Sequence, residues 1–370
     1  MVSEHDIEGD TKDVIKALAV RKNVILTGPP GTGKSRLLNQ VREMFAWDST
    51  YTGADPDGEI PIPPTSSPIP EWFPSPEQDV SRAVFPTVFD QNTKYRDFMR
   101  GLVPKIDIAG AFVVTEGTLY RASVHGSHDG NASLVIIDEI NRGPAVAAFG
   151  SALVGLEPDK RLPNGGVATP DTQYFELLDD TGNATTFALP EDVYILAAMN
   201  EADTSVEPLD VAFLRRFHIH RLEPNVEVLR AHLRLPAEHT ELPGTPTTEV
   251  AWYEALSQAF TKTNERILLG RGPAFQLGHG ALMHTLAPTD GPGGAQSYVA
   301  EAWATMRAHI DEVFFGDTRA IAEVLLAENP ASPYKLLETI FAGQTVRRII
   351  GPERPEPTDL YRLLALIAAS

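Results

Sequence analysis

The chain has 370 residues, of which 42% are hydrophobic, and it carries a formal net charge of −19. This length allows two packed domains, and the composition is ordinary for a soluble globular protein. The absence of cysteine excludes disulfides, thiolate metal sites and cysteine nucleophiles. The acidic surplus argues against a wide DNA-binding surface, since affinity for a duplex comes largely from basic groups that neutralise phosphates.

The same composition gives no sign of a membrane protein. No apolar run approaches the roughly 18–20 residues that are needed to span a bilayer. The first ten residues, MVSEHDIEGD, are acidic and polar, unlike a secretory signal. We therefore expect a cytoplasmic protein whose acidity either keeps it soluble or limits its contact with nucleic acid.

The N-terminal part of the chain alternates helical and strand patterns. Apolar spacing predicts a helix over 10–20, a buried strand over 23–26 and, after a loop rich in glycine and proline, a helix over 34–45. Residues 51–80 include eight prolines, which predicts an exposed insertion without a helix or a central strand.

Further strands and helices follow the insertion. Strands are predicted at 133–137 and 194–198, a helix at 145–156, and a hairpin at 175–178 and 185–189 around DDTGN. This alternation predicts a three-layer α/β domain with a parallel sheet over residues 1–223. The C-terminal residues 224–370 are predicted to form a helical lid domain, with helices at 248–268, 295–314, 318–327 and 360–368.

The loop between the first strand and the next helix matches the phosphate-loop pattern GxxxxGK[ST] in full. Its residues are Gly28, Pro29, Pro30, Gly31, Thr32, Gly33, Lys34 and Ser35. The glycines allow backbone N–H groups to surround phosphates at the N-terminus of the helix. Lys34 is predicted to reach the β- and γ-phosphates, and Ser35 to supply a hydroxyl to Mg²⁺. A glycine-rich turn without a ligand is the alternative, and the position between strand and helix disfavours it.

Two carboxylates follow the strand at 133–137. Asp138, at the C-terminal end of the strand, is predicted to hold Mg²⁺ through its water shell. Glu139 is predicted to orient and deprotonate the attacking water. Two acids that simply cap the next helix are the alternative.

Three further residues are candidates for the hydrolytic site. Asn200 ends the strand at 194–198, where an amide would lie beside the γ-phosphate and position the water; a turn-forming asparagine is the alternative. Arg215 and Arg216 follow LDVAFL and could reach a neighbouring subunit's nucleotide to offset transition-state charge. Ordinary surface charge is the other explanation for this pair.

Several segments resemble the AAA+ domain of the McrB family, the GTP-driven motors of McrBC-type restriction systems. They include YRDFMRGLVP at 95–104, IIDEINRG at 136–143, LPEDVYILAAMNEADTS at 189–205, NERI at 264–267 and LGHG at 277–280. The resemblance extends in order over roughly residues 14–330. The chain departs from the family at Glu201 and Thr204 in the MNTADRS-like loop, and at Leu214, which replaces the first of three arginines.

The resemblance implies a ring-shaped homo-oligomer, with six subunits expected, that drives an McrC-like nuclease or another effector in antiviral defence. GTP as substrate follows from the resemblance, and ATP from the prevalence of ATPases among AAA+ proteins. Because the phosphate loop begins at residue 28, we expect no DNA-reading domain ahead of it and DNA contact only through the assembled complex. A second carboxylate cluster for nuclease chemistry is not evident.

Two other functions remain as alternatives. MoxR-like ATPase chaperones, which remodel proteins, share the DEINR sequence but lack the YxDFxxG and LGHG segments. A nucleotide-switched assembly scaffold would turn over slowly, and Glu139 argues against it.

Overall fold

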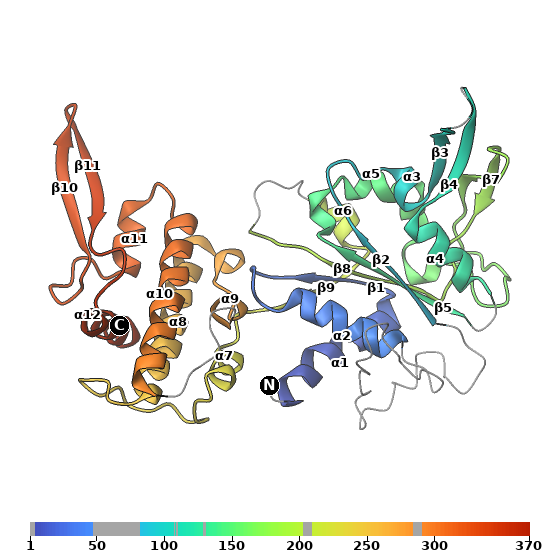
Figure 1. Ribbon diagram of the computed structural model, residues 1–370. Helices are drawn as coiled ribbons and strands as arrows, with labels where there is room; N and C mark the ends of the chain where they lie inside the picture. Colours follow the sequence, from blue (N-terminus) through green and yellow to red (C-terminus); the bar gives the residue numbers. More distant parts are fainter. Residues whose placement is uncertain are drawn as a thin grey trace. The chain divides into compact units, whose positions relative to one another are not determined.

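The computed structural model describes residues 4–46, 82–106, 108, 110–128, 131–202, 209–283 and 291–370. The proline-rich insertion expected at 51–80 lies outside these residues. The chain divides into two compact units (Figure 1). The α/β unit contains Ile7–Thr27 and Lys34–Arg221, and the helical unit contains Leu222–Ser370 together with Gly28–Gly33.

The α/β unit is built on a five-stranded parallel sheet with the order β2–β5–β8–β1–β9. The strands are β1 (Asn23–Thr27), β2 (Arg82–Val88), β5 (Ala132–Asp138), β8 (Val193–Ala198) and β9 (His218–Arg221). Every residue of β1 and β8 is buried, as is all of β5 except its last residue. Runs of valine, isoleucine, leucine and alanine suit strands that are covered on both faces. The parallel sheet predicted from the sequence is confirmed.

The pairing brings three strand ends to one edge of this sheet. In β8, Ala198 lies opposite Leu26 of β1, and Ala197 lies opposite Ile137 of β5. Because all of these strands are parallel, their C-terminal ends meet at the same edge, which is where ligands bind in open α/β sheets. The phosphate loop, the two acids and Asn200 follow these three ends.

Helices cover both faces of the sheet. The helix α1 (Glu4–Arg21) precedes β1, and α2 (Lys34–Ala46) lies on one face while α4 (Thr118–Gly126) lies on the other (Figure 1). In α2, Leu37, Leu38, Val41 and Phe45 are buried at helical spacing, which fixes the face that packs on the strands. The helices expected at 10–20 and 34–45 are thus present.

The helix expected at 145–156 is interrupted. It consists of α5 (Ala145–Phe149) and a 3-10 segment, η2 (Gly150–Gly155). Gly150 has φ +50°, a conformation that favours glycine, and a Cβ there would lie 2.5 Å from the ring of Tyr95 in α3 (Tyr95–Phe98). The close approach of this ring explains the break.

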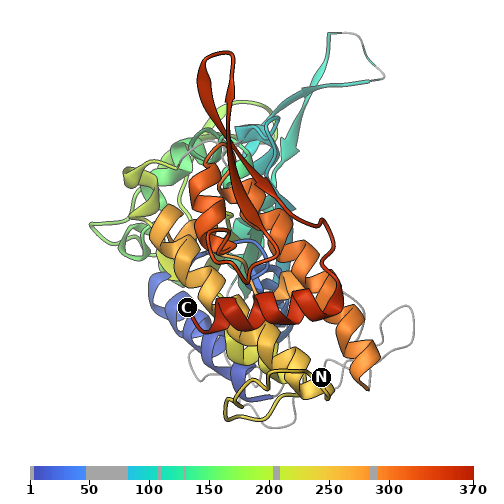
Figure 2. The same ribbon diagram turned by 90° about the vertical axis from the view of Figure 1, so that its left-hand side faces the viewer.

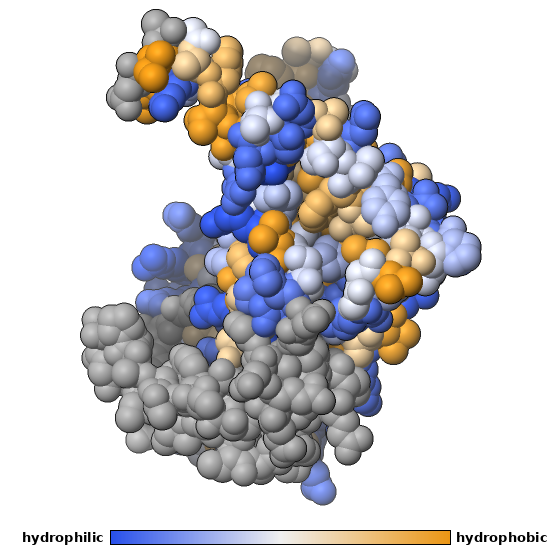
Figure 3. All heavy atoms as spheres, turned by 90° about the vertical axis from the view of Figure 1, so that its right-hand side faces the viewer, coloured by the Kyte–Doolittle hydropathy of each residue, from blue (hydrophilic) through white to orange (hydrophobic). Residues whose placement is uncertain are grey.

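Two hairpins extend the α/β unit. One pairs β6 (Phe175–Leu178) with β7 (Ala184–Phe187), which confirms the hairpin predicted around DDTGN. The other pairs β3 (Arg100–Pro104) with β4 (Phe112–Glu116) and was not expected. Ile106 is 99% exposed near its end, and Figure 3 shows hydrophobic atoms on this projecting part.

The helical unit packs its long helices around a shared core. Its helices are α7 (Val226–His232), α8 (Glu249–Arg271), α9 (Gly280–Met283), α10 (Pro292–Val313), α11 (Thr318–Val324) and α12 (Pro357–Ala368). The long helix α8 packs against α10 and α12, and Trp303 and Phe260 are among the largest buried side chains. The helices predicted for the C-terminal region are present.

One element of this unit is not helical. The strands β10 (Lys335–Phe341) and β11 (Gln344–Ile350) form an antiparallel hairpin whose base packs against α11 and whose tip projects beyond the helices (Figure 2). Ala342 and Gly343 both have positive φ, as a two-residue hairpin turn requires. The region is mostly helical, as expected, but the sequence analysis did not predict this hairpin.

Within the described part of the chain, no helix has both the length and the apolar character needed to cross a membrane.

Candidate nucleotide site

The phosphate loop connects β1 to the first residue of α2. Gly28, Gly31 and Gly33 all have positive φ, so the loop takes a backbone path that other residues rarely adopt. The buried Thr32 hydroxyl donates to the Pro29 carbonyl at 2.9 Å and closes the loop on itself. Lys34 begins the helix, so the loop leads directly into a helix N-terminus, which attracts anions.

Two carbonyls of this loop are bonded by the LGHG segment. The Gly278 N–H donates to Pro30 O at 3.2 Å, and the Gly280 N–H donates to Gly31 O at 2.8 Å. A Cβ on Gly278 would lie 2.2 Å from the carbonyl carbon of Gly31, so only glycine fits there. The backbone of LGHG therefore contacts the phosphate loop directly.

Lys34 is buried in a strongly charged environment. Its side chain is 8% exposed, and burial lowers the pKa of its ammonium to about 8. The carboxylates of Glu139, Glu201 and Asp138 oppose this shift, with Glu139 contributing most. Phosphates bound beside Lys34 would favour its charged form in the same way.

Glu139, directly after the end of β5, adopts an unusual backbone conformation. Glu139 has φ 54° and ψ 49°, the left-handed region, which costs a residue with a side chain about 1–3 kcal/mol. Its N–H donates to Asp138 Oδ1 at 3.0 Å. Strain of this kind is concentrated at functional sites, where neighbouring contacts impose it.

Contacts from two directions hold the Glu139 carboxylate. The Asn200 Nδ2 donates to Glu139 Oε1 at 3.0 Å, and Arg142 Nε lies 3.3 Å from Glu139 Oε2. The Asn200 Oδ1 is buried and has no hydrogen-bond partner among the residues that the structure describes. An amide oxygen in this state can accept a hydrogen bond from a water that the carboxylate also contacts. The structure thus brings Glu139 and Asn200 together.

Comparison with known proteins identifies the domain. Residues 78–217 match the AAA domain family of the dynein-related subfamily. The chain is 26% identical to the type IV methyl-directed restriction enzyme EcoKMcrB subunit of Escherichia coli K12 over 84% of this chain and 57% of that protein. It is 28% identical to the type II restriction enzyme BsuMI component YdiS of Bacillus subtilis 168, over 55% of this chain and 58% of that one. The chain carries an McrB-like AAA+ domain.

The chain spans less than three fifths of the length of these two relatives. A solved structure of PCH-2 from C. elegans aligns with 82% of this chain and 70% of its own, at 12% identity and a TM-score of 0.35. That superposition is too loose to add to the assignment.

The two arginines after α6 (Val211–Leu214) differ in their surroundings. In this McrB-like domain, the Arg216 guanidinium donates to the carbonyls of Leu153, at 3.0 Å, and Ala212. Arg215 is exposed; its backbone N–H donates to the Val211 carbonyl, and within the described residues no hydrogen bond or ion pair is found for its guanidinium. The sequence treats the two alike, whereas the structure fixes one to its own chain and leaves the other at the surface.

Other polar and charged residues near the carboxylates were not assigned a role from the sequence. Glu201, noted only as a departure from the family, pairs with Arg221 at 2.7 Å at the end of β9. Arg142 and Asn141 lie in the 3-10 turn η1 (Ile140–Arg142), and Asn141 Nδ2 donates to the Asn200 carbonyl at 2.9 Å. The available signal was position, since Asn141, Arg142 and Glu201 come shortly after buried parallel strands and Arg221 ends the partly exposed strand β9.

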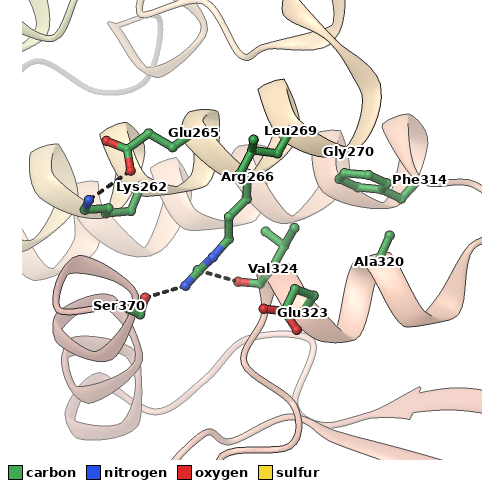
Figure 4. A pocket seen from close by; sticks show the side chains of 10 residues that line it. All are labelled: Lys262, Glu265, Arg266, Leu269, Gly270, Phe314, Ala320, Glu323, Val324 and Ser370. Atoms are coloured by element: carbon green, nitrogen blue, oxygen red, sulfur yellow. Dashed lines mark hydrogen bonds and ion pairs between the residues drawn. The ribbon is translucent and has the colours of Figure 1, made fainter.

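The helical unit also contains a cavity of about 500 Å³ (Figure 4). Arg266 crosses it and donates to the Val324 carbonyl and the Ser370 hydroxyl, while Lys262 pairs with Glu265 at 2.8 Å. None of the residues predicted to handle the nucleotide lines it.

Proposed function

We propose that this domain hydrolyses a nucleoside triphosphate, ATP or GTP, with Mg²⁺. The observation that supports this most directly concerns the Glu139 carboxylate. It accepts a hydrogen bond from Asn200 at 3.0 Å, and among the neighbouring carboxylates it does most to raise the pKa of Lys34. A carboxylate that accepts a hydrogen bond from an amide and interacts electrostatically with a phosphate-binding lysine can accept the proton of an attacking water.

In this proposal the residues Gly28–Ser35 bind the triphosphate. The loop N–H groups and the start of α2 would contact the phosphates, and Lys34 would offset charge on the β- and γ-phosphates. Asn200 would orient the water through its amide, and Glu139 would take its proton. We also propose that residues 1–223 form the nucleotide-binding domain and residues 224–370 form the lid.

The donors near the phosphate loop suit a magnesium ion. Ser35 is exposed in the first turn of α2, and Asp138 ends β5, so a hydroxyl and a carboxylate would hold the metal. Mg²⁺ prefers oxygen ligands and keeps several waters, which these two donors allow. Bound there, the ion would neutralise charge that develops on the phosphates.

We propose that the active form is a ring, a hexamer in the simplest case, with Arg215 contributing to the neighbouring subunit's site. Arg215 is favoured over Arg216, whose guanidinium is already bonded to Leu153 and Ala212 carbonyls of its own chain. An exposed arginine can reach the phosphates of a neighbour and stabilise transition-state charge.

The biological role that we propose is that of a motor subunit in a cytoplasmic McrBC-like defence complex. Both curated relatives are named as restriction components, which favours this role over that of a MoxR-like chaperone. A nuclease or other effector subunit would be the partner. With a net charge of −19, the chain would contact DNA only through the assembled complex.

Steady-state hydrolysis of ATP, GTP and CTP, with and without DNA, tests this proposal. We expect Mg²⁺-dependent release of phosphate from ATP or GTP. The Glu139→Gln variant should bind nucleotide as tightly as the wild type and turn over about 10²-fold more slowly. As a control, Glu116→Gln alters a half-exposed glutamate of the same unit, paired with Arg100, and should retain activity. Equal turnover in Glu139→Gln and the wild type would contradict the proposed role of this residue.

A further inference from the structure

The 3-10 turn η1 (Ile140–Arg142) follows the two acids directly and contacts both members of the proposed water-activating pair. Arg142 Nε lies 3.3 Å from Glu139 Oε2, and Asn141 Nδ2 donates to the backbone carbonyl of Asn200 at 2.9 Å. The 3.0 Å bond from Asn200 to Glu139 Oε1 completes the set, so that the turn, Asn200 and Glu139 are each linked to the other two.

The polar contacts of Glu139 bear on the orientation of its carboxylate. The left-handed backbone of Glu139 determines the direction in which its side chain leaves the chain, and the polar groups around the carboxylate influence which way its two oxygens face. One oxygen is bonded by an amide, and the other faces a guanidinium. Together these two groups favour one orientation of the carboxylate. In that orientation, Glu139 raises the pKa of Lys34 more than the other carboxylates do.

Exposure distinguishes the two residues of the turn. The Arg142 side chain is 53% exposed and Glu139 is 23% exposed, whereas Asn141 is 5% exposed. An ion pair at such a half-exposed position contributes little to the stability of a fold. A stability role therefore explains Arg142 poorly, and a role in orienting Glu139 explains it better.

We propose that Arg142 is a positioning residue, which holds the Glu139 carboxylate toward the attacking water while Asn141 ties the turn to the end of β8. This inference rests on the proposed function, because it assigns Arg142 to a base that the proposal names. It adds a residue that neither the phosphate-loop motif nor the two acids identify.

The test is a double-mutant cycle between Arg142→Ala and Glu139→Gln, with turnover and nucleotide affinity measured for all four proteins. Arg142→Ala alone should lower turnover about tenfold, since a misplaced base loses rate, and leave the dissociation constant of the nucleotide unchanged. In the Glu139→Gln background it should have no further effect, because nothing remains to be positioned. Arg142→Lys should recover part of the loss.

The control variant is Arg96→Ala. Arg96 lies in the same unit, is 41% exposed and pairs with a neighbouring acid at 3.6 Å, so its loss also removes a partly exposed arginine and its ion pair but leaves the contact with Glu139 intact. Its turnover should equal that of the wild type.

The outcomes separate the two proposals. Full activity of Glu139→Gln would refute the function proposed for Glu139, whatever Arg142 does. A normal loss in Glu139→Gln with an equal tenfold loss from Arg142→Ala in both backgrounds would overturn the inference alone. So would unchanged turnover in Arg142→Ala, or a loss explained wholly by weaker nucleotide binding.

Discussion

The turn after β5 and the end of α6 present their charges in opposite ways. After β5, Glu139 is contacted by Asn200 and Arg142 of its own chain. After α6, Arg215 is exposed, while its neighbour Arg216 is bonded to two carbonyls. The Glu139 carboxylate therefore has its partners within its own chain, whereas the exposed Arg215 guanidinium has no partner among the described residues. Under the proposed function, we expect water activation to use groups of one subunit and charge compensation in the transition state to need an arginine from a second subunit.

The largest effect should come from Arg215. Arg215→Ala should lower turnover by about 10³-fold in the assembled protein, because transition-state charge on the phosphates is then uncompensated. Mixing this variant with Lys34→Ala should restore part of the activity, since the Lys34→Ala subunit supplies Arg215 to an intact neighbouring site. Phosphate release across mixing ratios measures this. No recovery at any ratio, with both variants folded and assembled, would contradict a shared site.

Glu139 should behave differently in the same assay. Glu139→Gln lowers turnover by about 10²-fold, and mixing it with Lys34→Ala should give no recovery, because each variant lacks a group that acts in its own site. A mixture of Glu139→Gln with Arg215→Ala should recover activity, since the former still carries Arg215. Recovery in the mixture of Glu139→Gln with Lys34→Ala would show that Glu139 and Lys34 do not act in the same subunit's site.

A third variant addresses the backbone contacts of the phosphate loop. Gly278→Ala places a methyl group 2.2 Å from the Gly31 carbonyl carbon, so the loop or the LGHG segment must move. We expect nucleotide affinity to fall about tenfold, as the Pro30 and Gly31 carbonyls lose their donors. Titration with a fluorescent nucleotide measures this. Gly244→Ala is the control, because nothing lies within 4 Å of a Cβ there, and an equal loss in both variants would contradict a specific contact.

The smallest effect is expected from Arg216. Arg216→Ala should lower the free energy of unfolding by about 1–2 kcal/mol, since the Leu153 and Ala212 carbonyls lose a charged donor. Thermal unfolding measures this, and turnover per folded subunit should remain close to that of the wild type. A loss of turnover as large as that of Arg215→Ala would indicate that both arginines act in the neighbouring subunit's site.

The parts of the fold that could be predicted from the sequence are those determined by residues close together in the chain. The glycines before Lys34 and the apolar run before Asp138 predicted a loop and a strand that the structure contains. The contact of Arg142 with Glu139 was not predictable in this way, because it depends on the left-handed backbone of Glu139. Adjacent arginines such as Arg215 and Arg216 also look alike until the position of the Leu153 carbonyl is known.

The missed hairpin β10–β11 has a different cause. Its strands, KLLETIF and QTVRRII, lack the strict apolar–polar alternation of a half-buried strand, and Ala342 and Gly343 form the turn between them. Strand patterns of this length carry little information when helices surround them on both sides. The β-branched residues of QTVRRII were the available signal.

The strand order of the sheet also dictates when each part of the α/β unit can fold during synthesis. Strand β1 emerges from the ribosome early, yet its partners are β8 and β9, with Asn23 opposite Ile195 and Val24 opposite His218. Strands β2 and β5 are closer in the chain and can pair sooner. Contacts between distant segments form slowly because loop closure opposes them. We therefore expect nascent chains that end before β8 to leave β1, and the phosphate loop after it, without the neighbours that hold them in the sheet.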